Sequence, residues 1–197
     1  MADSSSSGRR KRWFLPLFIV FILVSSAFGV FIGGFNSSPS PTSTVTVGNT
    51  EFSQQSDGRW TGTANGVSLT LSSPPAELSP FVSSVSFDAF SSAQKLYLSV
   101  DPSNSPYLAL NDVYATLRNS PLPSVVLACS IEGPGCENLP IKTCLDAGSG
   151  VIVLSFASNN ETTSTVNYTD GCYIFSGNSE ALLQAADAFL LQLFGVI

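Results

Sequence analysis

Histidine is absent from this chain of 197 residues. Its absence excludes the Ser-His-Asp and Cys-His arrangements of nucleophilic catalysis, and it excludes every histidine-ligated metal centre. The enzymatic chemistry that remains depends on carboxylates, on Ser-Lys pairs or on oxygen-ligated cations. The sequence contains neither a calcium-loop pattern nor a pair of carboxylates at a spacing that predicts acid–base partnership. It therefore predicts no catalytic residue, no metal and no cofactor, and it leaves a carboxylate-dependent enzyme open.

Basic residues are also few, and they are unevenly distributed. Four of the eight Lys and Arg residues stand together at positions 9–12. Without these four and Asp3, the chain has 13 acidic and 4 basic side chains, a net charge of −9. Phosphate contacts need clustered Lys and Arg side chains, so this acidic part is not expected to bind nucleic acid or to lie flat on an anionic membrane.

One long hydrophobic run follows the basic cluster. Residues 13–35, WFLPLFIVFILVSSAFGVFIGGF, contain no charged side chain. As a helix they reach about 34 Å, enough to span a hydrocarbon core of about 30 Å. The basic cluster predicts that residues 1–12 are a cytoplasmic tail and that everything after the run lies outside, in a single-pass cell-membrane protein. A signal peptide cleaved after Ala27 is the alternative; the apolar run continues past Ala27, which favours a retained anchor.

The exported part has a stalk and one domain. Residues 36–44, NSSPSPTST, predict a polar, extended stalk. Residues 45–197 are the size of one ordinary globular domain. Three Asn-x-Ser/Thr sequons, at Asn36, Asn160 and Asn167, are candidate glycosylation sites of an exported glycoprotein.

The domain begins with short alternating runs. TEFSQQ, RWTGTA and VSLTLS are separated by the dipeptides DG and NG, which favour hairpin turns. These runs predict a three-stranded antiparallel meander. A short helix over residues 76–85 is expected after the Pro-Pro dipeptide that follows.

The second half changes character. Residues 95–100, 124–130 and 150–156 are predicted strands, and the last two are apolar without alternation. Such runs suit strands buried on both faces of a parallel sheet that helices cover. A final hairpin pairs STVNY with CYIFS across a DG turn. The expected fold class is α+β or α/β, with the meander followed by a mixed sheet.

Two helices are predicted to cover this sheet. Residues 106–119 have Leu108, Val113 and Leu117 on one side. The closing segment SEALLQAADAFLLQLFGVI confines its polar residues to one narrow stripe, so most of its surface must be buried. The stripe consists of Glu180, Gln184, Asp187 and Gln192. We expect this helix to pack on the sheet; a docking surface for a protein partner is the alternative.

The four cysteines are predicted to form two disulfides. They are Cys129, Cys136, Cys144 and Cys172. Their spacing lacks the C-x₂₋₄-C pairs of zinc sites and the C-x-x-C of thiol-redox centres. An even number of cysteines in an exported domain is typical of disulfides. Of the three connectivities, Cys129–Cys136 with Cys144–Cys172 is favoured, because EGPG can turn the chain back and the second bond would tie the loop to the last strand.

Two aspartates stand beside predicted strands. Asp101 ends the strand at 95–100, and ligand sites in parallel sheets collect at the carboxyl ends of strands. The segment DPSNS is also ordinary turn chemistry, which is the preferred interpretation. Asp146 in DAGSG precedes a strand, whereas a phosphate-binding glycine loop follows one. Neither aspartate is therefore assigned a catalytic role.

Four segments in the last part of the chain resemble a known group of proteins. They are VVLACS, CENLPIKTC, GCYIFSGNSE and AADAFLLQLFGVI. With the overall layout, they resemble a group of uncharacterised archaeal proteins that are short, carry one N-terminal membrane anchor and end in a comparable helix. The resemblance implies membrane anchoring and an extracytoplasmic domain with matching cysteines, and it implies no activity.

The sequence favours a non-enzymatic, membrane-anchored domain of the cell surface with an interaction or envelope-associated role. A carboxylate-dependent extracytoplasmic hydrolase and a subunit of a larger membrane complex are the alternatives. Two carboxylates converging in a closed apolar pocket would favour the hydrolase. A closing helix fully buried in its own domain would argue against the subunit.

Overall fold

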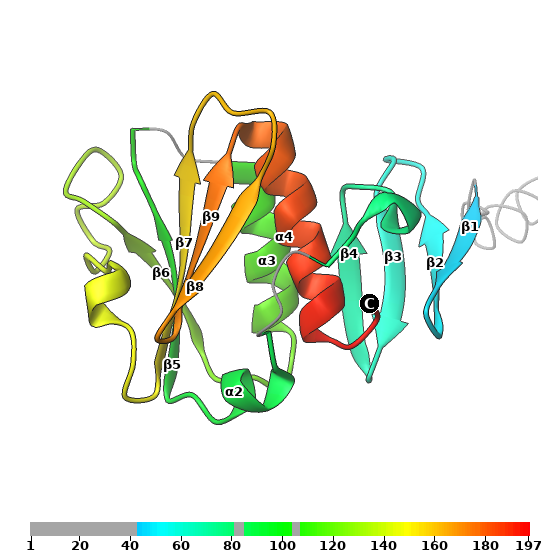
Figure 1. The fold of residues 1–197 in the computed structure, drawn as a ribbon, viewed down its shortest axis with the longest axis horizontal. Coiled ribbons are helices and arrows are strands. Elements are labelled where there is room, and N and C mark those ends of the chain that lie inside the picture. Colours follow the sequence, from blue (N-terminus) through cyan, green and yellow to red (C-terminus); the bar gives the residue numbers. More distant parts are fainter. Residues whose placement is uncertain (1–42, 81–84, 104–106) are drawn as a thin grey trace, which may run out of the picture. The chain divides into compact units, whose positions relative to one another are not determined.

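Two sheets with helices between them make up the described part of the chain (Figure 1). The computed structural model describes residues 43–80, 85–103 and 107–197. The predicted cytoplasmic tail, the predicted membrane anchor and Asn36 lie outside these residues. Within the described ranges, no helix is both long and apolar enough to cross a bilayer.

The first sheet is an antiparallel meander of four strands, one more than predicted. Its strands are β1 (Thr44–Val47), β2 (Thr50–Gln54), β3 (Trp60–Ala64) and β4 (Val67–Leu71). The additional strand β1 pairs with β2 through a two-residue turn at Gly48 and Asn49, with Val47 opposite Thr50. Asn65 and Gly66 both have positive φ, which confirms the hairpin turn predicted from NG.

The second sheet has five strands and is mixed, as predicted. They are β5 (Lys95–Val100), β6 (Val125–Cys129), β7 (Val151–Ser158), β8 (Thr165–Thr169) and β9 (Cys172–Gly177). Their order is β6-β5-β7-β9-β8, with only β8 antiparallel to its neighbour. Asp170 and Gly171 form the predicted β8–β9 turn with positive φ. Parallel β5, β6 and β7 place the carboxyl ends of three strands at one edge.

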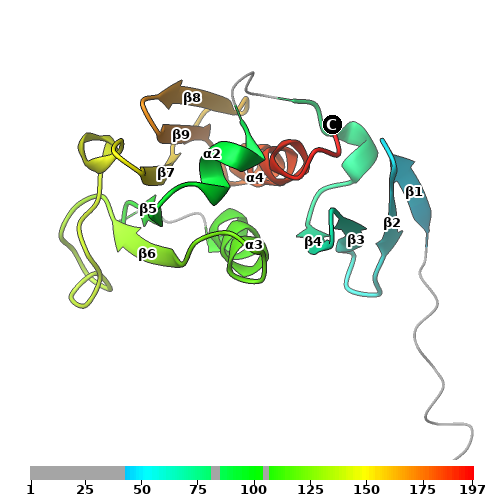
Figure 2. The same ribbon diagram turned by 90° about the horizontal axis from the view of Figure 1, so that it is seen from below.

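Two long helices, α3 (Tyr107–Arg118) and α4 (Ser179–Leu193), lie on the same side of the five-stranded sheet (Figure 2). The prediction of a sheet covered by helices therefore holds for one face. Val113 and Leu117 of α3 are buried as predicted, but Leu108 is 68% exposed. Five residues at 100° each place Leu108 about 140° around the helix from Val113, which is why the prediction for Leu108 was wrong.

The helix predicted over residues 76–85 is not formed as one element. A 3₁₀ helix covers Pro75–Glu77, and a separate short helix, α2, covers Phe87–Ser91. Residues 78–80 are not helical, and residues 81–84 lie outside the described part. Pro80 gives the physical reason, because the residue before a proline is disfavoured in helical conformation.

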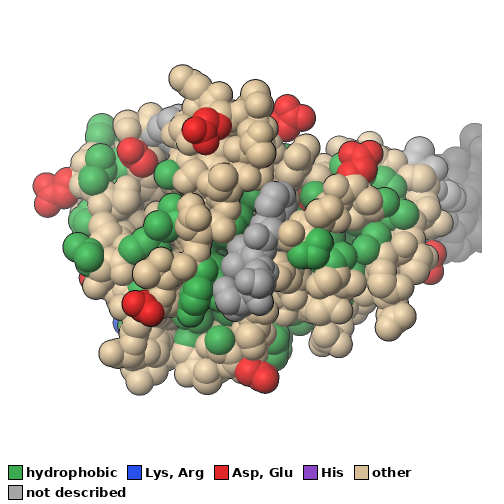
Figure 3. All heavy atoms as spheres, viewed as in Figure 1, with side chains coloured by type: hydrophobic (Ala, Val, Ile, Leu, Met, Phe, Trp, Pro, Cys, Tyr) green, Lys and Arg blue, Asp and Glu red, His purple; other side chains and the backbone are tan. Residues whose placement is uncertain are grey.

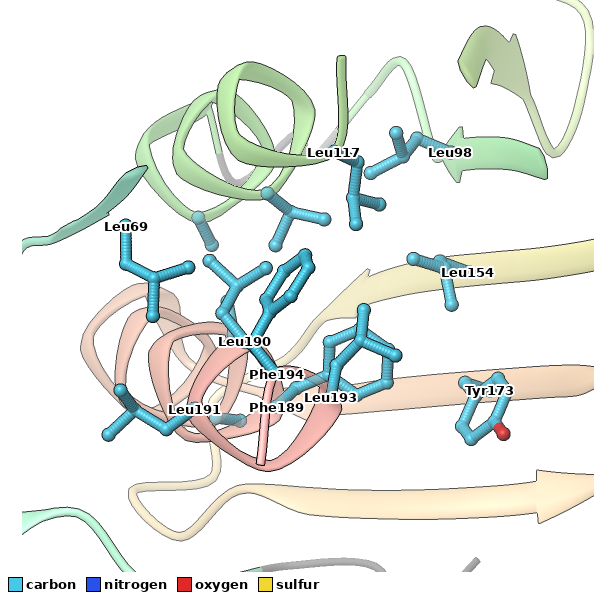
Figure 4. Close-up of a cluster of buried hydrophobic side chains, with 14 of the residues drawn as sticks. Leu69, Leu98, Leu117, Leu154, Tyr173, Phe189, Leu190, Leu191, Leu193 and Phe194 are labelled. Atoms are coloured by element: carbon cyan, nitrogen blue, oxygen red, sulfur yellow. The ribbon is translucent and has the colours of Figure 1, made fainter. Parts of the chain in front are cut away.

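The core lies between the two sheets. Side chains from the meander, both long helices and the five-stranded sheet form one buried apolar cluster. Figure 4 shows Leu69 of β4, Leu117 of α3 and Leu190 of α4 in this cluster, with Leu154 and Tyr173 on the strands beyond them. Leu110 of α3 and Val100 of β5 belong to the same cluster, and both also line the candidate site.

Candidate binding site

A pocket of about 240 Å³ lies at the carboxyl ends of β5 and β6, and we call it the carboxyl-edge pocket. Val100 of β5, Leu127 of β6 and Leu110 of α3 supply apolar walls, and Asn111 of α3 lines it beside them. The loop after β6 contributes a further wall that includes Gly135. In open parallel sheets, ligands bind outside the carboxyl ends of the strands, and the pocket lies at this end of β5 and β6.

The Cys129–Cys136 disulfide holds the loop that forms this further wall. The two Cα atoms are 6.1 Å apart, and both cysteines line the pocket. The N–H of Cys129 donates to the carbonyl of Pro140, and the N–H of Lys142 donates to the carbonyl of Cys129. The loop therefore leaves β6 and returns beside it, fixed at both ends.

The second disulfide, Cys144–Cys172, ties the 3₁₀ helix Cys144–Asp146 to the first residue of β9. Its Cα atoms are 5.2 Å apart. The structure thus has the cysteine pairing that the sequence favoured, and none of the four cysteines is free.

Two carboxylates adjoin the carboxyl-edge pocket. Asp101 follows Val100 and accepts hydrogen bonds from the backbone N–H and the hydroxyl of Ser103, which lower its pKa. This geometry confirms the turn interpretation of Asp101. Glu137 accepts from its own backbone N–H and from that of pocket-lining Gly135, at 3.1 Å, and these bonds lower its pKa. Both carboxylates are therefore ionised at neutral pH, and no Lys or Arg is among the residues that line this pocket.

Large apolar side chains are exposed on the elements around the pocket. Leu108 is 68% exposed and stands three residues before Asn111, on the same side of α3. Ile131, in the loop after β6, is 52% exposed. On the face drawn in Figure 3, acidic side chains stand out at several points, while Lys and Arg side chains are barely visible. With the two carboxylates described above, the surroundings of the pocket combine apolar surface with negative charge.

A second pocket, of about 260 Å³, lies at the opposite edge of the sheet, beside the amino ends of β7 and β9. Tyr168, Tyr173 and Asp170 line it together with Gly148, Gly150 and Gly171. Burial raises the pKa of Tyr173 to about 12, so its hydroxyl keeps its proton at neutral pH. Because sites in parallel sheets collect at the other edge, this pocket is the weaker candidate.

The structure also brings together two carboxylates that the sequence did not pair. Asp187 of α4 is completely buried and accepts the backbone N–H groups of Ser72 and Ser73 through Oδ2. Asp112 of α3 accepts the hydroxyl of Ser72 at 2.6 Å. The sequence places Asp187 in the polar stripe of α4, outside the surface that was expected to be buried. The structure buries it, because Ser72 and Ser73, which follow β4, cover this side of the helix.

Burial shifts the pKa values of both carboxyl groups in the same direction. It raises the pKa of Asp187 to about 7, opposed by the hydrogen bonds from Ser73 and Ser72 and reinforced by the charge of Asp112. It also raises the pKa of Asp112, opposed by the hydroxyl of Ser72 and the charge of Arg59. Oδ1 of Asp187 has no hydrogen-bond partner. Neither carboxylate lines either pocket described above, so the pair joins the meander to the helices rather than facing a ligand there.

The other predicted site residues are placed as follows. Asn160 lies in the loop between β7 and β8, and Asn167 lies in β8; both are exposed. Asp146 binds Lys142 at 2.8 Å and accepts from the N–H of Thr143, as a capping residue does. The described residues contain no group of three or more His, Cys, Asp and Glu side chains that could hold a metal ion.

Comparison with known proteins gives no match to a family model, to a curated protein or to a solved structure.

Proposed function

We propose that this protein is a membrane-anchored, extracytoplasmic binding domain whose site is the carboxyl-edge pocket. The observation that carries the proposal is the Cys129–Cys136 disulfide, which forms part of the pocket lining. Disulfides persist in oxidising compartments, which supports a place outside the cytoplasm. A cross-linked wall is ordered before the ligand arrives, and such preorganisation lowers the entropic cost of binding. Residues 13–35 would hold the domain at the membrane.

The chemistry of the pocket supports binding rather than catalysis. A carboxyl group that acts as a general acid needs a raised pKa near the working pH. The pKa values of Asp101 and Glu137 are instead lowered by hydrogen bonds to Ser103 and to backbone N–H groups. Fixed negative charges beside an apolar cavity are suited to recognising a partner, in an interaction or envelope-associated role.

The pocket is also a better partner site than the closing helix. Ten residues of α4 are buried, and seven of them belong to the core that both sheets share. A helix used in this way has little surface left for another subunit. The proposal therefore places the partner at the carboxyl-edge pocket.

Two measurements on the full chain test this proposal. In the first, Ser5→Cys and Asn119→Cys variants are treated in whole cells with a membrane-impermeant maleimide. We expect Asn119→Cys, at an exposed position after α3, to be labelled in intact cells, and the matched Ser5→Cys only after lysis. Labelling of Asn119→Cys only after lysis would contradict the proposed topology.

In the second, the membrane-purified wild-type protein is alkylated without reduction and its intact mass is measured. Four unmodified cysteines and an intact N-terminal segment are expected. Four alkylated cysteines would overturn the oxidised-domain proposal, and loss of residues through Ala27 would show a released protein instead of an anchored one.

A further inference from the structure

We propose that the carboxyl-edge pocket binds a cationic peptide segment of a partner protein, with one large apolar side chain in the pocket and Lys or Arg side chains beside Asp101 and Glu137. The inference deepens the proposed function, because it names the partner of the same site. It does not depend on the topology, since the pocket belongs to the folded domain.

The size of the pocket points to one side chain. Its volume is about 240 Å³. A cavity of about 150 Å³ holds benzene, and pockets for drug-sized ligands or cofactors begin near 300 Å³. The pocket therefore suits a Leu or Phe side chain better than a cofactor. Its walls fit this occupant, because Val100, Leu110 and Leu127 present apolar atoms.

Charge complementarity points to a cation beside that side chain. Asp101 stands between the pocket-lining residues Val100 and Pro102. Glu137 accepts a hydrogen bond from the backbone N–H of pocket-lining Gly135. Two of the described basic residues have acidic partners of their own, Arg59 with Asp57 and Lys142 with Asp146. Lys95 and Arg118 lie at the ends of β5 and α3 that are remote from the pocket. The carboxylates at the pocket are thus left for a partner.

Exposed apolar surface extends the site beyond the pocket. Leu108 and Ile131 are 68% and 52% exposed on the two elements that line it. Leu108 stands one turn before pocket-lining Asn111, and Ile131 stands two residues after pocket-lining Cys129, so a segment bound at the pocket can also contact them. A peptide is favoured over a membrane surface, because the acidic groups would be repelled by anionic lipid headgroups.

The test uses the full chain in nanodiscs of zwitterionic lipid and three fluorescent peptides. The signal measured with empty nanodiscs is subtracted. The peptides contain Lys-Leu-Lys, Lys-Ala-Lys or Glu-Leu-Glu between Gly-Ser flanks, and binding is followed by anisotropy. We expect Lys-Leu-Lys to bind, Lys-Ala-Lys to bind at least about tenfold more weakly for lack of apolar burial, and Glu-Leu-Glu not to bind. Added salt should weaken the Lys-Leu-Lys complex.

Matched variants locate the site. Asn111→Trp fills the pocket mouth from an exposed helix position and should weaken Lys-Leu-Lys binding at least about tenfold. Ala115→Trp adds the same side chain one turn further along α3, where it is exposed and away from the pocket lining, and should leave binding unchanged. Glu137→Gln keeps an acceptor for Gly135 but removes the charge, and should weaken binding about threefold to fivefold. Glu51→Gln, at an exposed position of β2, is its control.

Three results would overturn the inference. The first is equal binding of Glu-Leu-Glu and Lys-Leu-Lys, and the second is wild-type affinity in the Asn111→Trp variant. The third is that none of the three peptides binds, whether or not the protein binds vesicles of anionic lipid. Circular dichroism of each variant confirms folding before its affinity is compared. If Asn119→Cys is labelled only after lysis but the Lys-Leu-Lys peptide still binds, the proposed topology is refuted and this inference stands.

Discussion

Asp187 accepts a hydrogen bond from the backbone N–H of Ser73, with 2.7 Å between the nitrogen and Oδ2. The N–H of Ser72 donates to the same oxygen at 3.0 Å, and the hydroxyl of Ser72 donates to Asp112. The residues after β4 are thus held by a carboxylate from each long helix. Because burial raises the pKa of Asp187 to about 7, this junction between meander and helices titrates near neutral pH.

We expect the free energy of unfolding to fall as the pH rises from 5 to 8. A carboxyl group whose pKa is higher in the folded state stabilises the fold fully below its unfolded value, 3.8, and this stabilisation is lost as the pH rises through about 7. The loss between pH 5 and pH 8 is at most about 3 kcal/mol. Asp112, whose pKa burial also raises, acts in the same direction. Urea unfolding of the full chain at several pH values measures the slope.

Asp187→Asn should remove most of this pH dependence, because the amide keeps a carbonyl acceptor for Ser73 and does not titrate. Glu180→Gln, at an exposed position on the same helix, should leave the slope as in the wild type. An unchanged slope in Asp187→Asn would show that another group is responsible.

Opening the two disulfides should cost different amounts of stability. Cys144–Cys172 closes a sequence separation of 28 residues, and Cys129–Cys136 closes one of 7. In the chain-entropy model these closures stabilise the fold by about 3.6 and about 2.4 kcal/mol respectively. We therefore expect the Cys144→Ala/Cys172→Ala variant to be the less stable of the two double variants in urea unfolding. The reverse order would argue against chain entropy as the main contribution.

The same pair of variants should act in the opposite order on peptide binding. Only Cys129–Cys136 lines the carboxyl-edge pocket. Removing this disulfide takes away the cross-link that orders the loop wall of the pocket. The Cys129→Ala/Cys136→Ala variant should therefore lose more affinity for the Lys-Leu-Lys peptide, although it is the more stable of the two variants.

Much of the fold could be predicted from local patterns. NG and DG favour turns with positive φ, and Asn65-Gly66 and Asp170-Gly171 form them. Strand β1 was missed because TVTV is short and largely exposed, so its Thr and Val residues merge with the Ser/Thr-rich sequence before it. The Gly-Asn dipeptide that joins β1 to β2 was the available signal.

The candidate site could not be predicted from local sequence patterns. The carboxyl-edge pocket is made by the ends of two strands, one face of α3 and a cross-linked loop, which meet only in the folded chain. The partners of Asp187 are 114 and 115 residues away in sequence. A polar stripe marks the solvent-exposed side of a helix when the helix packs against the protein on its other side only. Helix α4 instead has a sheet on each of two sides. Tertiary packing therefore decided the role of Asp187.

Gly62 of β3 should not tolerate even a methyl group. A Cβ at this position would lie 2.7 Å from Cδ1 of Phe52 and 2.9 Å from the backbone oxygen of Glu51. The ring can rotate away only at the expense of core packing, and the backbone oxygen belongs to a paired strand. Gly62→Ala should destabilise the domain by about 1–3 kcal/mol. Thermal unfolding measures the loss, and Thr63→Ala, at the next and exposed position of the strand, should have the smaller effect.

The open edge of the five-stranded sheet should promote self-association. β8 is an edge strand with the sequence TVNYT, which contains no charge and no proline, and four of its five residues are exposed. Unprotected edges of this composition pair with strands of other chains, and a lysine on the edge prevents such pairing. In protein made without glycosylation, Asn167→Lys should reduce association in analytical ultracentrifugation. Asn160→Lys makes the same charge change in the neighbouring loop and should not. Equal effects of the two variants would assign the change to net charge instead of to the edge strand.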